Sequence, residues 1–303
     1  MLINVARPSG CCYGVARALN MARRAAKEHR EGGGVKSLGP LIHNPQVVHD
    51  LQAAGVTPVQ SLDGLYGEPL LIRTHGVAPA VIEQAELQNL QVIDATCPYV
   101  ARAQQAAAQL VDDGFRVVIV GEAGHAEVIG IRARAGADAL VVATPDDLPA
   151  PPALVGERIG VVVQTTQTPA ALDAVVRVLS GRAAELRVVN TICSATTKRQ
   201  QAAAETADAV EVMLVLGGRN SGNTQRLFAI CAAINPHTHL IESAAEIDER
   251  WFEDADSCGV SAGASTPEEQ IQGVIRRLEE IGERKAQAAI KAIEDNRDAS
   301  ESE

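Results

Sequence analysis

Three cysteines divide this chain into stretches of similar length, and each cysteine is followed by the same succession of polar loops. Cys12, Cys97 and Cys193 are separated by 85 and 96 residues. Each follows a strand-like run and precedes a helical pattern. Because similar features that recur at a fixed interval indicate a repeated structural unit, the spacing predicts a chain built from three copies of one unit.

Two polar loops follow each cysteine at similar distances. Each loop comes after a strand-like run and contains residues that can bind an anion. The residues that we equate in the first loop are His43, His125 and Asn223, and those in the second loop are His75, Thr165 and Ser265. The matching chemistry, and not the spacing alone, favours a threefold repeat.

Short β-branched runs alternate with Ala-rich helical patterns along the whole chain, which is typical of an α/β fold with mostly parallel sheets. The expected strands are 2–6, 70–73, 91–94, 116–121, 140–143, 158–163, 187–189, 213–217 and 258–261, and the clearest helical patterns are 14–29, 195–210 and 268–281.

The predicted architecture is three small α/β lobes related by pseudo-threefold symmetry, with the cysteines at the centre. The carboxyl ends of the strands, where α/β proteins bind ligands, would converge there. The expected lobes are 13–97, 98–193 and 194–281, with a strand in 1–12 packing on the third lobe and a charged C-terminal tail at 282–303.

The composition excludes several classes of protein. The net charge is −11 and no basic run stands out, which argues against nucleic-acid binding. No apolar stretch approaches the ~20 residues of a membrane span, and the N-terminus does not resemble a signal peptide. We therefore expect a cytoplasmic protein. Its six cysteines form no C-x-x-C pair and are not a disulfide framework.

One thiolate from each lobe would make a trigonal site for a soft metal, which leaves zinc, copper(I) and iron–sulfur clusters open. A structural zinc site needs a fourth protein ligand. A [4Fe–4S] cluster with three cysteine ligands would leave one iron open to a substrate. We interpret Cys11, Cys231 and Cys258 as packing residues, because buried free cysteines commonly behave as small hydrophobic side chains.

The polar loops suit a phosphate or diphosphate, because imidazoles, hydroxyls, an amide and helix N-terminal N–H groups all bind anions. The set comprises His43, His75, His125, Ser221, Asn223 and Ser265. Glu127 follows His125 closely and could deliver a proton, although an acidic residue is also common in the first turn of a helix. Thr165, in a Gln-Thr-Thr stretch, could bond a substrate oxygen.

Nine ordered motifs extend over nearly the whole chain, from about Asn4 to Arg277. They are GCCYGV, HNPQVV, RTHGV, DATCP, GHAEV, QTT, TICSAT, NSGNTQRL and GVSAGAST. In order and spacing they closely resemble those of the 4-hydroxy-3-methylbut-2-enyl diphosphate reductases, the IspH/LytB family.

The resemblance implies reductive removal of the substrate hydroxyl, yielding isopentenyl diphosphate and dimethylallyl diphosphate in the last step of the non-mevalonate isoprenoid pathway. It implies a [4Fe–4S] cluster on Cys12, Cys97 and Cys193, and ferredoxin or flavodoxin as electron donor. The diphosphate would be held by His43, His75, His125, Ser221, Gly222, Asn223 and Ser265. Glu127, Thr165 and His125 would be the catalytic residues, Glu127 feeding protons and Thr165 positioning the hydroxyl.

The sequence departs from the family pattern at a few positions. Gly222 stands where the family often has Ser, so only its backbone N–H can contact the substrate. Cys11, Tyr13, Ala126 and Asn190 are milder departures, and none removes a cysteine ligand or Glu127.

Two other hypotheses remain at this stage. One is a non-catalytic iron–sulfur or zinc protein that binds a diphosphate. The other is a zinc-stabilised α/β phosphatase or transferase, which would contain zinc and no sulfide.

Overall fold

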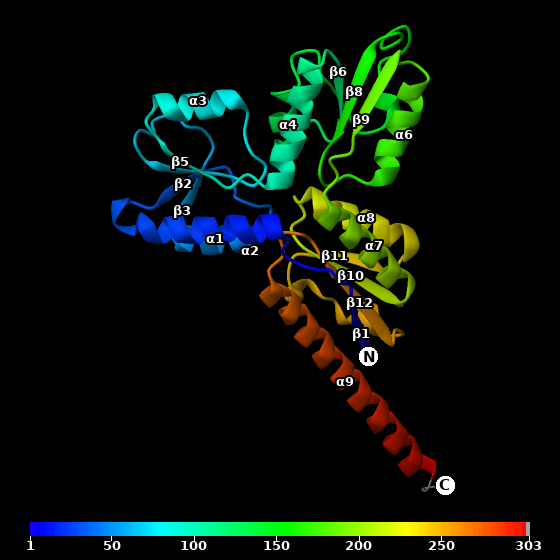
Figure 1. The fold of residues 1–303 in the computed structure, drawn as a ribbon. Helices are drawn as coiled ribbons and strands as arrows, with labels where there is room; N and C mark the ends of the chain where they lie inside the picture. The colour runs from blue at the N-terminus through cyan, green and yellow to red at the C-terminus, as the bar shows by residue number, and fades with distance from the viewer. Residues whose placement is uncertain (301–303) are drawn as a thin grey trace. The chain divides into compact units, whose positions relative to one another are not determined.

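The computed structural model describes residues 1–300, with side chains as far as residue 295, and the chain forms two compact units (Figure 1). One unit is Cys12–Thr197. The other combines Met1–Cys11 with the chain from Lys198 onward. Within the described residues, no helix has both the length and the apolar character needed to cross a membrane.

The first unit contains two four-stranded parallel sheets. The first sheet has the order β3-β2-β4-β5 and the second has the order β7-β6-β8-β9. The strands are β2 (Val35–Leu38), β3 (Val56–Val59), β4 (Pro69–Ile72), β5 (Gln91–Asp94), β6 (Arg116–Val120), β7 (Leu140–Val142), β8 (Arg158–Val163) and β9 (Glu185–Val189). The helices are α1 (Tyr13–Glu28), η1 (Arg30–Gly32), α2 (Pro45–Ala53), α3 (Pro79–Leu87), α4 (Pro98–Asp112), α5 (Ala126–Arg132), η2 (Pro145–Asp147) and α6 (Pro169–Ser180).

The second unit contains one parallel sheet with the order β1-β12-β10-β11. Its strands are β1 (Leu2–Val5), β10 (Val212–Leu216), β11 (Thr238–Ile241) and β12 (Ser257–Ala262). The chain enters it through α7 (Ser194–Asp208), and the remaining elements are α8 (Gly222–Ile234), η3 (Ala244–Glu246), η4 (Glu249–Phe252) and α9 (Glu268–Ser300).

All three sheets share one topology. In the first two sheets, the first strand along the chain lies between the second and the third, and the fourth is at an edge; in the third sheet β10 lies between β11 and β12 in the same way. In the third sheet the edge position is occupied by β1, which pairs in parallel with β12. This confirms three α/β lobes with parallel sheets. Their arrangement around a common axis and the exact lobe boundaries stay predictions.

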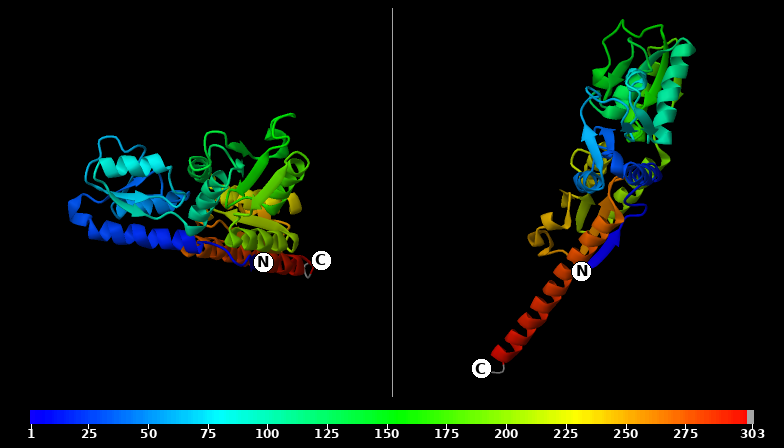
Figure 2. Two further views of the ribbon diagram at one scale, coloured as in Figure 1. Left: turned by 45° about the horizontal axis from the view of Figure 1, so that its top comes forward. Right: turned by 90° about the vertical axis from the view of Figure 1, so that its left-hand side faces the viewer.

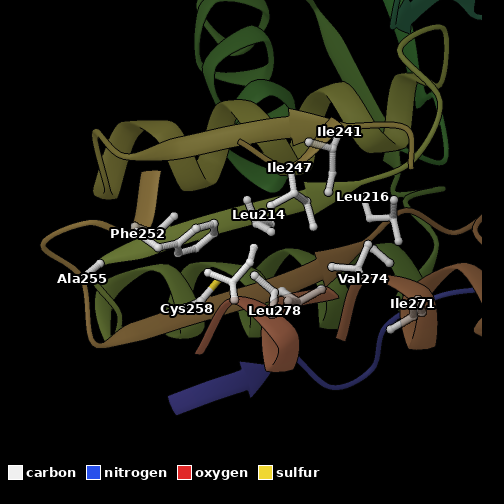
Figure 3. Close-up of a cluster of buried hydrophobic side chains, with 14 residues drawn as sticks. Leu214, Leu216, Ile241, Ile247, Phe252, Ala255, Cys258, Ile271, Val274 and Leu278 are labelled. Carbon is white, nitrogen blue, oxygen red and sulfur yellow. The ribbon is translucent and has the colours of Figure 1, made fainter. Parts of the chain in front are cut away.

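The central strands of the sheets, such as β6, β8 and β10, are buried on both faces and are apolar. In β6, Val117 and Ile119 belong to one hydrophobic cluster, whereas Val118 and Val120 belong to another. This alternation explains why such strands have continuous apolar runs, as is typical of buried parallel sheets. Figure 3 shows the corresponding cluster in the second unit, where Leu214 and Leu216 pack against Val274 and Leu278 of α9.

The C-terminal tail continues a helix as far as Ser300. Figure 2 shows α9 as one continuous helix whose C-terminal end projects away from the sheet that it packs against. Residues 301–303, which belong to the predicted tail, lie outside the described residues.

The repeat aligns differently from the predicted pairing. The N-cap residues of α2, α5 and α8 are Asn44, His125 and Ser221. His125 therefore corresponds to Ser221 and to Asn44, and equating it with Asn223 and His43 was wrong. His125 and Ser221 each lie 28 residues after the cysteine of their lobe, whereas Asn223 lies 30 residues after Cys193, so the choice of an amide side chain and not the spacing misplaced that residue.

Candidate active site

Each of the three predicted cysteine ligands lies at the start of a helix. Cys12 is the N-cap of α1, Cys97 is the N-cap of α4, and Cys193 directly precedes α7. A helix N-terminus favours negative charge. These positions therefore favour thiolates or a negatively charged group bound to them.

The cysteine backbones are anchored in corresponding ways. The N–H of Cys97 donates to the carbonyl of Thr74 over 2.9 Å, and the N–H of Cys193 donates to the carbonyl of Thr165 over 3.0 Å. Thr165 thus corresponds to Thr74 and not to His75, which corrects the second pairing of the repeat. Cys97 and Cys193 are thus each held by the polar loop that follows a neighbouring strand.

The thiols of Cys12, Cys97 and Cys193 lie near one another and are half-buried. Burial raises the pKa of Cys97, and the nearby Cys12 and Cys193 thiols raise it further, whereas the backbone N–H groups of Tyr99 and Val100 lower it. A Cβ atom at Gly14 would lie 2.5 Å from the Cys97 sulfur and 3.9 Å from the Cys12 sulfur. Glycine at this position leaves room for thiols. These residues fit a group held by soft ligands.

The remaining cysteines are of two kinds. Cys231 and Cys258 are buried in hydrophobic clusters, and burial raises the pKa of each thiol to about 12. They are therefore neutral at physiological pH and act as packing residues. Cys11 is half-buried and belongs to the second unit.

The histidine trio (His43, His75 and His125) gathers in the first unit. The ring centroids of His43 and His75 are 4.7 Å apart, those of His75 and His125 are 5.3 Å apart, and those of His43 and His125 are 6.0 Å apart. One nitrogen from each ring can be chosen so that all three lie within 4.8 Å of one another. Three loops distant in sequence thus converge on one small polar site.

The electrostatics of the histidine trio favour an anion over a metal cation. Burial lowers the pKa of His43, and burial lowers the pKa of His75 further below its usual range. The Arg73 guanidinium lowers the pKa of both rings. Neutral imidazoles can donate hydrogen bonds, and the neighbouring cation would attract a phosphate and repel a divalent metal.

Arg73 was not singled out from the sequence, although it belongs to the RTHGV motif. It follows β4 directly, and a Cβ at Gly39 would lie 2.7 Å from its Nη1 atom. Within the described residues its Nε atom is buried without a hydrogen-bond partner. An arginine in a polar loop directly after an apolar strand is the sequence signal that could have identified it.

Glu127 is buried beside Thr165, with 1% of its surface exposed. Oε1 accepts a hydrogen bond from the Thr165 N–H over 2.6 Å, and Oε2 accepts one from the Thr165 hydroxyl over 2.8 Å. Burial raises the pKa of Glu127 to about 7, although both hydrogen bonds from Thr165 lower it. The carboxyl group can therefore hold and release a proton near neutral pH.

His125 has one ring nitrogen committed to the backbone. Its Nδ1 accepts a hydrogen bond from the N–H of Glu127 over 3.2 Å and thereby caps α5. In the neutral ring the proton is then on Nε2. The hydrogen bond from the Glu127 N–H therefore fixes the tautomer of the His125 ring.

A second set of predicted residues lies in the other unit, around the N-terminus of α8. Ser221 caps this helix by accepting a hydrogen bond from the Thr224 N–H over 3.4 Å, and Gly222 is the first helical residue. Asn223 is 6% exposed, and among the described residues neither its Nδ2 nor its Oδ1 atom has a hydrogen-bond partner. Ser265 is also buried and follows β12. A helix N-terminus with an unpartnered amide suits an anionic group.

The structure thus brings the predicted residues together in two sets, one in each compact unit. Cys12, Cys97, Cys193, the histidine trio, Glu127 and Thr165 belong to Cys12–Thr197, whereas Ser221, Gly222, Asn223 and Ser265 belong to the other unit.

A family model described as LytB protein matches residues 3–279. The chain belongs to the LytB family. This confirms the resemblance inferred from the nine motifs. The LytB match ends at residue 279, whereas α9 continues to Ser300.

Curated LytB relatives carry the name 4-hydroxy-3-methylbut-2-enyl diphosphate reductase. The protein from Geobacter metallireducens is 44% identical over 281 residues, covering 93% of this chain and 98% of the relative. The protein from Aquifex aeolicus is 44% identical over 285 residues, covering 93% and 97%.

Two solved structures are also similar to this LytB chain. A structure of (E)-4-hydroxy-3-methyl-but-2-enyl diphosphate reductase, described as the terminal enzyme of the non-mevalonate pathway, matches with a TM-score of 0.69 and 42% identity. The match covers 92% of this chain and 100% of that one. The E-1-hydroxy-2-methyl-but-2-enyl-4-diphosphate reductase from Plasmodium falciparum matches with a TM-score of 0.84 and 24% identity over 91% of this chain and 87% of that one, and supports the fold alone.

Proposed function

We propose that this chain catalyses the reductive dehydroxylation of (E)-4-hydroxy-3-methylbut-2-enyl diphosphate to isopentenyl diphosphate and dimethylallyl diphosphate, the last step of the non-mevalonate isoprenoid pathway. The substrate takes up two electrons and two protons, its C–O bond breaks, and the hydroxyl leaves as water. LytB family membership supports the reaction. The observation that carries it is that one compact unit contains three neighbouring thiols, a histidine trio and a buried carboxyl group with a pKa of about 7.

Cys12, Cys97 and Cys193 would hold a [4Fe–4S] cluster in which one iron has no cysteine ligand. When bound, such a cluster supplies electrons and a Lewis-acidic iron for the substrate hydroxyl.

The histidine trio would bind the diphosphate of the substrate. Its neutral rings can donate hydrogen bonds, and the nearby Arg73 adds positive potential. We also assign Ser221, Gly222, Asn223 and Ser265 to diphosphate binding, through hydroxyl, amide and helix N-terminal N–H groups. Binding energy from the diphosphate, which does not react, can then position the hydroxyl carbon.

Glu127 would deliver the proton that turns the leaving hydroxide into water. Its pKa of about 7 keeps a substantial protonated fraction at neutral pH. The hydrogen bond between Oε2 and the Thr165 hydroxyl offers a relay to the substrate, with His125 nearby as a further hydrogen-bond donor.

The electron donor would be a ferredoxin or a flavodoxin, and the protein would act in the cytoplasm. A non-catalytic protein with the same thiols would leave Glu127, a buried acid with a pKa of about 7 beside the histidine trio, without a function. A zinc phosphatase or transferase would need a fourth zinc ligand at the thiols.

The test is metal analysis followed by turnover. After anaerobic purification we expect about four iron and about four acid-labile sulfide per chain, little zinc, and conversion of the substrate with reduced methyl viologen. Stoichiometric zinc without sulfide, persisting after cluster reconstitution, would overturn the cofactor. A complete cluster without turnover would overturn the reaction.

A further inference from the structure

Two of the three tyrosines are exposed beside predicted cysteine ligands. Tyr13 directly follows Cys12 and is 70% exposed, and Tyr99 lies two residues after Cys97 and is 37% exposed. Aromatic residues make up only 2% of the chain. Two of the few aromatic side chains are therefore exposed next to predicted cysteine ligands. Tyrosine is among the residues that are enriched in protein interfaces.

The helices that carry these tyrosines lack acidic residues near their starts. The chain has 38 Asp and Glu residues among 303, yet none occurs in 12–27 or in 95–111. Helix N-termini normally favour acidic side chains. The first turns of α2, α3, α6, α7 and α8 lack acidic residues as well, and the stretches at α1 and α4 contain Arg17 and Arg102.

The starts of α1 and α4 lie side by side within one compact unit (Figure 1). Gly14 approaches the Cys97 sulfur, and the Nη1 atom of Arg17 donates to the Thr96 carbonyl over 3.2 Å. Tyr13 and Arg17 are one turn apart on α1, and Tyr99 and Arg102 are one turn apart on α4, so each pair shares a helix face. We call Tyr13, Arg17, Tyr99 and Arg102 the tyrosine–arginine face.

Among the described residues, the arginines of this face are not held in ion pairs, although the Asp94 carboxylate lies nearby and accepts the Thr96 N–H over 2.8 Å. In the described part of the chain, neither Arg17 nor Arg102 forms an ion pair, whereas many other arginines do. A positive face on a chain of net charge −11 would orient an acidic partner toward this place.

We propose that the tyrosine–arginine face docks a small acidic one-electron carrier protein. This inference rests on the proposed function, because the reaction needs two electrons that arrive singly. Electron transfer slows steeply with distance, so a carrier has to dock where the cysteine-bound group is nearest the surface. The face borders Cys12 and Cys97, and it combines exposed tyrosines with arginines that carry no ion pair, a composition typical of interface hot spots.

The test compares two sources of electrons. Tyr13→Ala and Arg102→Glu are made singly and together, with Tyr66→Ala and Arg177→Glu as matched controls. Tyr66 is 71% exposed, and Arg177 is an exposed arginine on α6 without an ion pair in the described part of the chain. Turnover is measured with an acidic plant-type [2Fe–2S] ferredoxin and with reduced methyl viologen, which needs no docking surface. Ferredoxin affinity is measured separately by calorimetry, with both proteins oxidised.

In the double variant we expect the KM and the Kd for ferredoxin to rise about tenfold or more at low ionic strength. Viologen-driven turnover should stay within about twofold of the wild type, and added salt should weaken the wild type more than Arg102→Glu. Ferredoxin kinetics and affinity equal to those of the controls would overturn the docking face.

Two further outcomes distinguish docking from a structural role and from a failure of the proposed function. A parallel fall of ferredoxin-driven and viologen-driven turnover, with a shifted reduction potential, would mean that these residues stabilise the cysteine-bound group, and it would overturn docking. Absence of viologen-driven turnover in the wild type would count against the proposed function itself. Ferredoxin affinity, which does not depend on turnover, would still decide whether the face docks the carrier.

Discussion

Glu127 accepts both hydrogen bonds that Thr165 can donate, one from its backbone N–H over 2.6 Å and one from its hydroxyl over 2.8 Å. The N–H bond fixes the position of the carboxyl group, and the hydroxyl bond connects it to a side chain that can exchange protons. The backbone carbonyl of Thr165 also accepts a hydrogen bond from the N–H of Cys193. The predicted acid is therefore positioned by the loop that holds one of the predicted cluster ligands.

Replacing Glu127 with Gln should abolish most turnover and leave cofactor content and substrate binding intact. Gln has nearly the same size but cannot donate a carboxyl proton, so we expect turnover to fall by about 10²-fold or more. Iron and sulfide content, viologen-driven turnover and diphosphate affinity measured on the same preparation check this. Thr165→Val should lower turnover and Thr165→Ser should largely retain it. An unchanged rate in Glu127→Gln would refute the role in proton transfer.

Glu127 should also make the stability of the protein depend on pH. Burial raises its folded-state pKa from 4.5 to about 7, so the folded state favours the protonated carboxyl group. The contribution is fully present below pH 4.5 and is lost as the pH rises through 7. At pH 8, Glu127→Gln should therefore be more stable than the wild type, by on the order of 2 kcal/mol.

Thermal unfolding of both proteins from pH 5 to pH 8.5 measures this difference. The melting temperatures should diverge with rising pH, whereas Glu86→Gln, at an exposed carboxylate on α3, should follow the wild type throughout. Parallel curves for Glu127→Gln and the wild type would mean that this carboxyl group is ionised in the folded protein at low pH.

Gly14→Ala should weaken cofactor binding without unfolding the protein. The new Cβ would lie 2.5 Å from the Cys97 sulfur, which is closer than real Cβ contacts allow. Alanine favours a helix over glycine by about 1 kcal/mol, so the helix itself should not suffer. Iron and sulfide per chain should fall below half of the wild-type values. Gly124→Ala is the control, because nothing lies within 4 Å of the added atom. Full occupancy in Gly14→Ala would contradict this role.

Much of the fold was predictable because burial on both sheet faces produces apolar runs that the sequence shows directly. Three strands were missed for identifiable reasons. β3 contains Pro58 and lies at a sheet edge, β2 follows three glycines in 32–34, and β11 mixes Thr238 and His239 with two apolar residues. Each pairs in parallel with a neighbour that lies elsewhere in the chain, so partner strands and not local composition determine these elements.

The members of the candidate site were predictable, whereas their electrostatics were not. The spacing of polar residues after strands predicted the histidine trio, which the structure brings together. The shifted pKa of Glu127 depends on its burial, and Arg73 acts on His43 and His75 through space. Neither effect has a local sequence signal, because both arise from the packing of segments that are far apart in the chain.

Two asparagines of similar burial at the two ends of α8 allow a matched test of anion binding. Asn223, near the start of the helix, has no hydrogen-bond partner for either amide atom in the part of the chain that the structure describes. Asn235 directly follows the helix. Its Nδ2 donates hydrogen bonds to the carbonyls of Ala207 and Val210, and its Oδ1 accepts one from the His237 N–H. Both side chains are in residues that are 6% exposed. A buried unpartnered amide costs stability, whereas a satisfied one contributes about 1 kcal/mol per hydrogen bond.

Asn223→Ala should therefore bind inorganic pyrophosphate about tenfold more weakly while its melting temperature stays equal or rises. Asn235→Ala should show the reverse, a lower melting temperature with unchanged pyrophosphate affinity. Calorimetric titration and thermal unfolding of the two variants measure both quantities. If Asn223→Ala lost stability and kept its affinity, the Asn223 amide would be a structural element of α8 and not an anion ligand. Because the two variants remove the same chemical group, any difference between them reflects what the folded chain places around it.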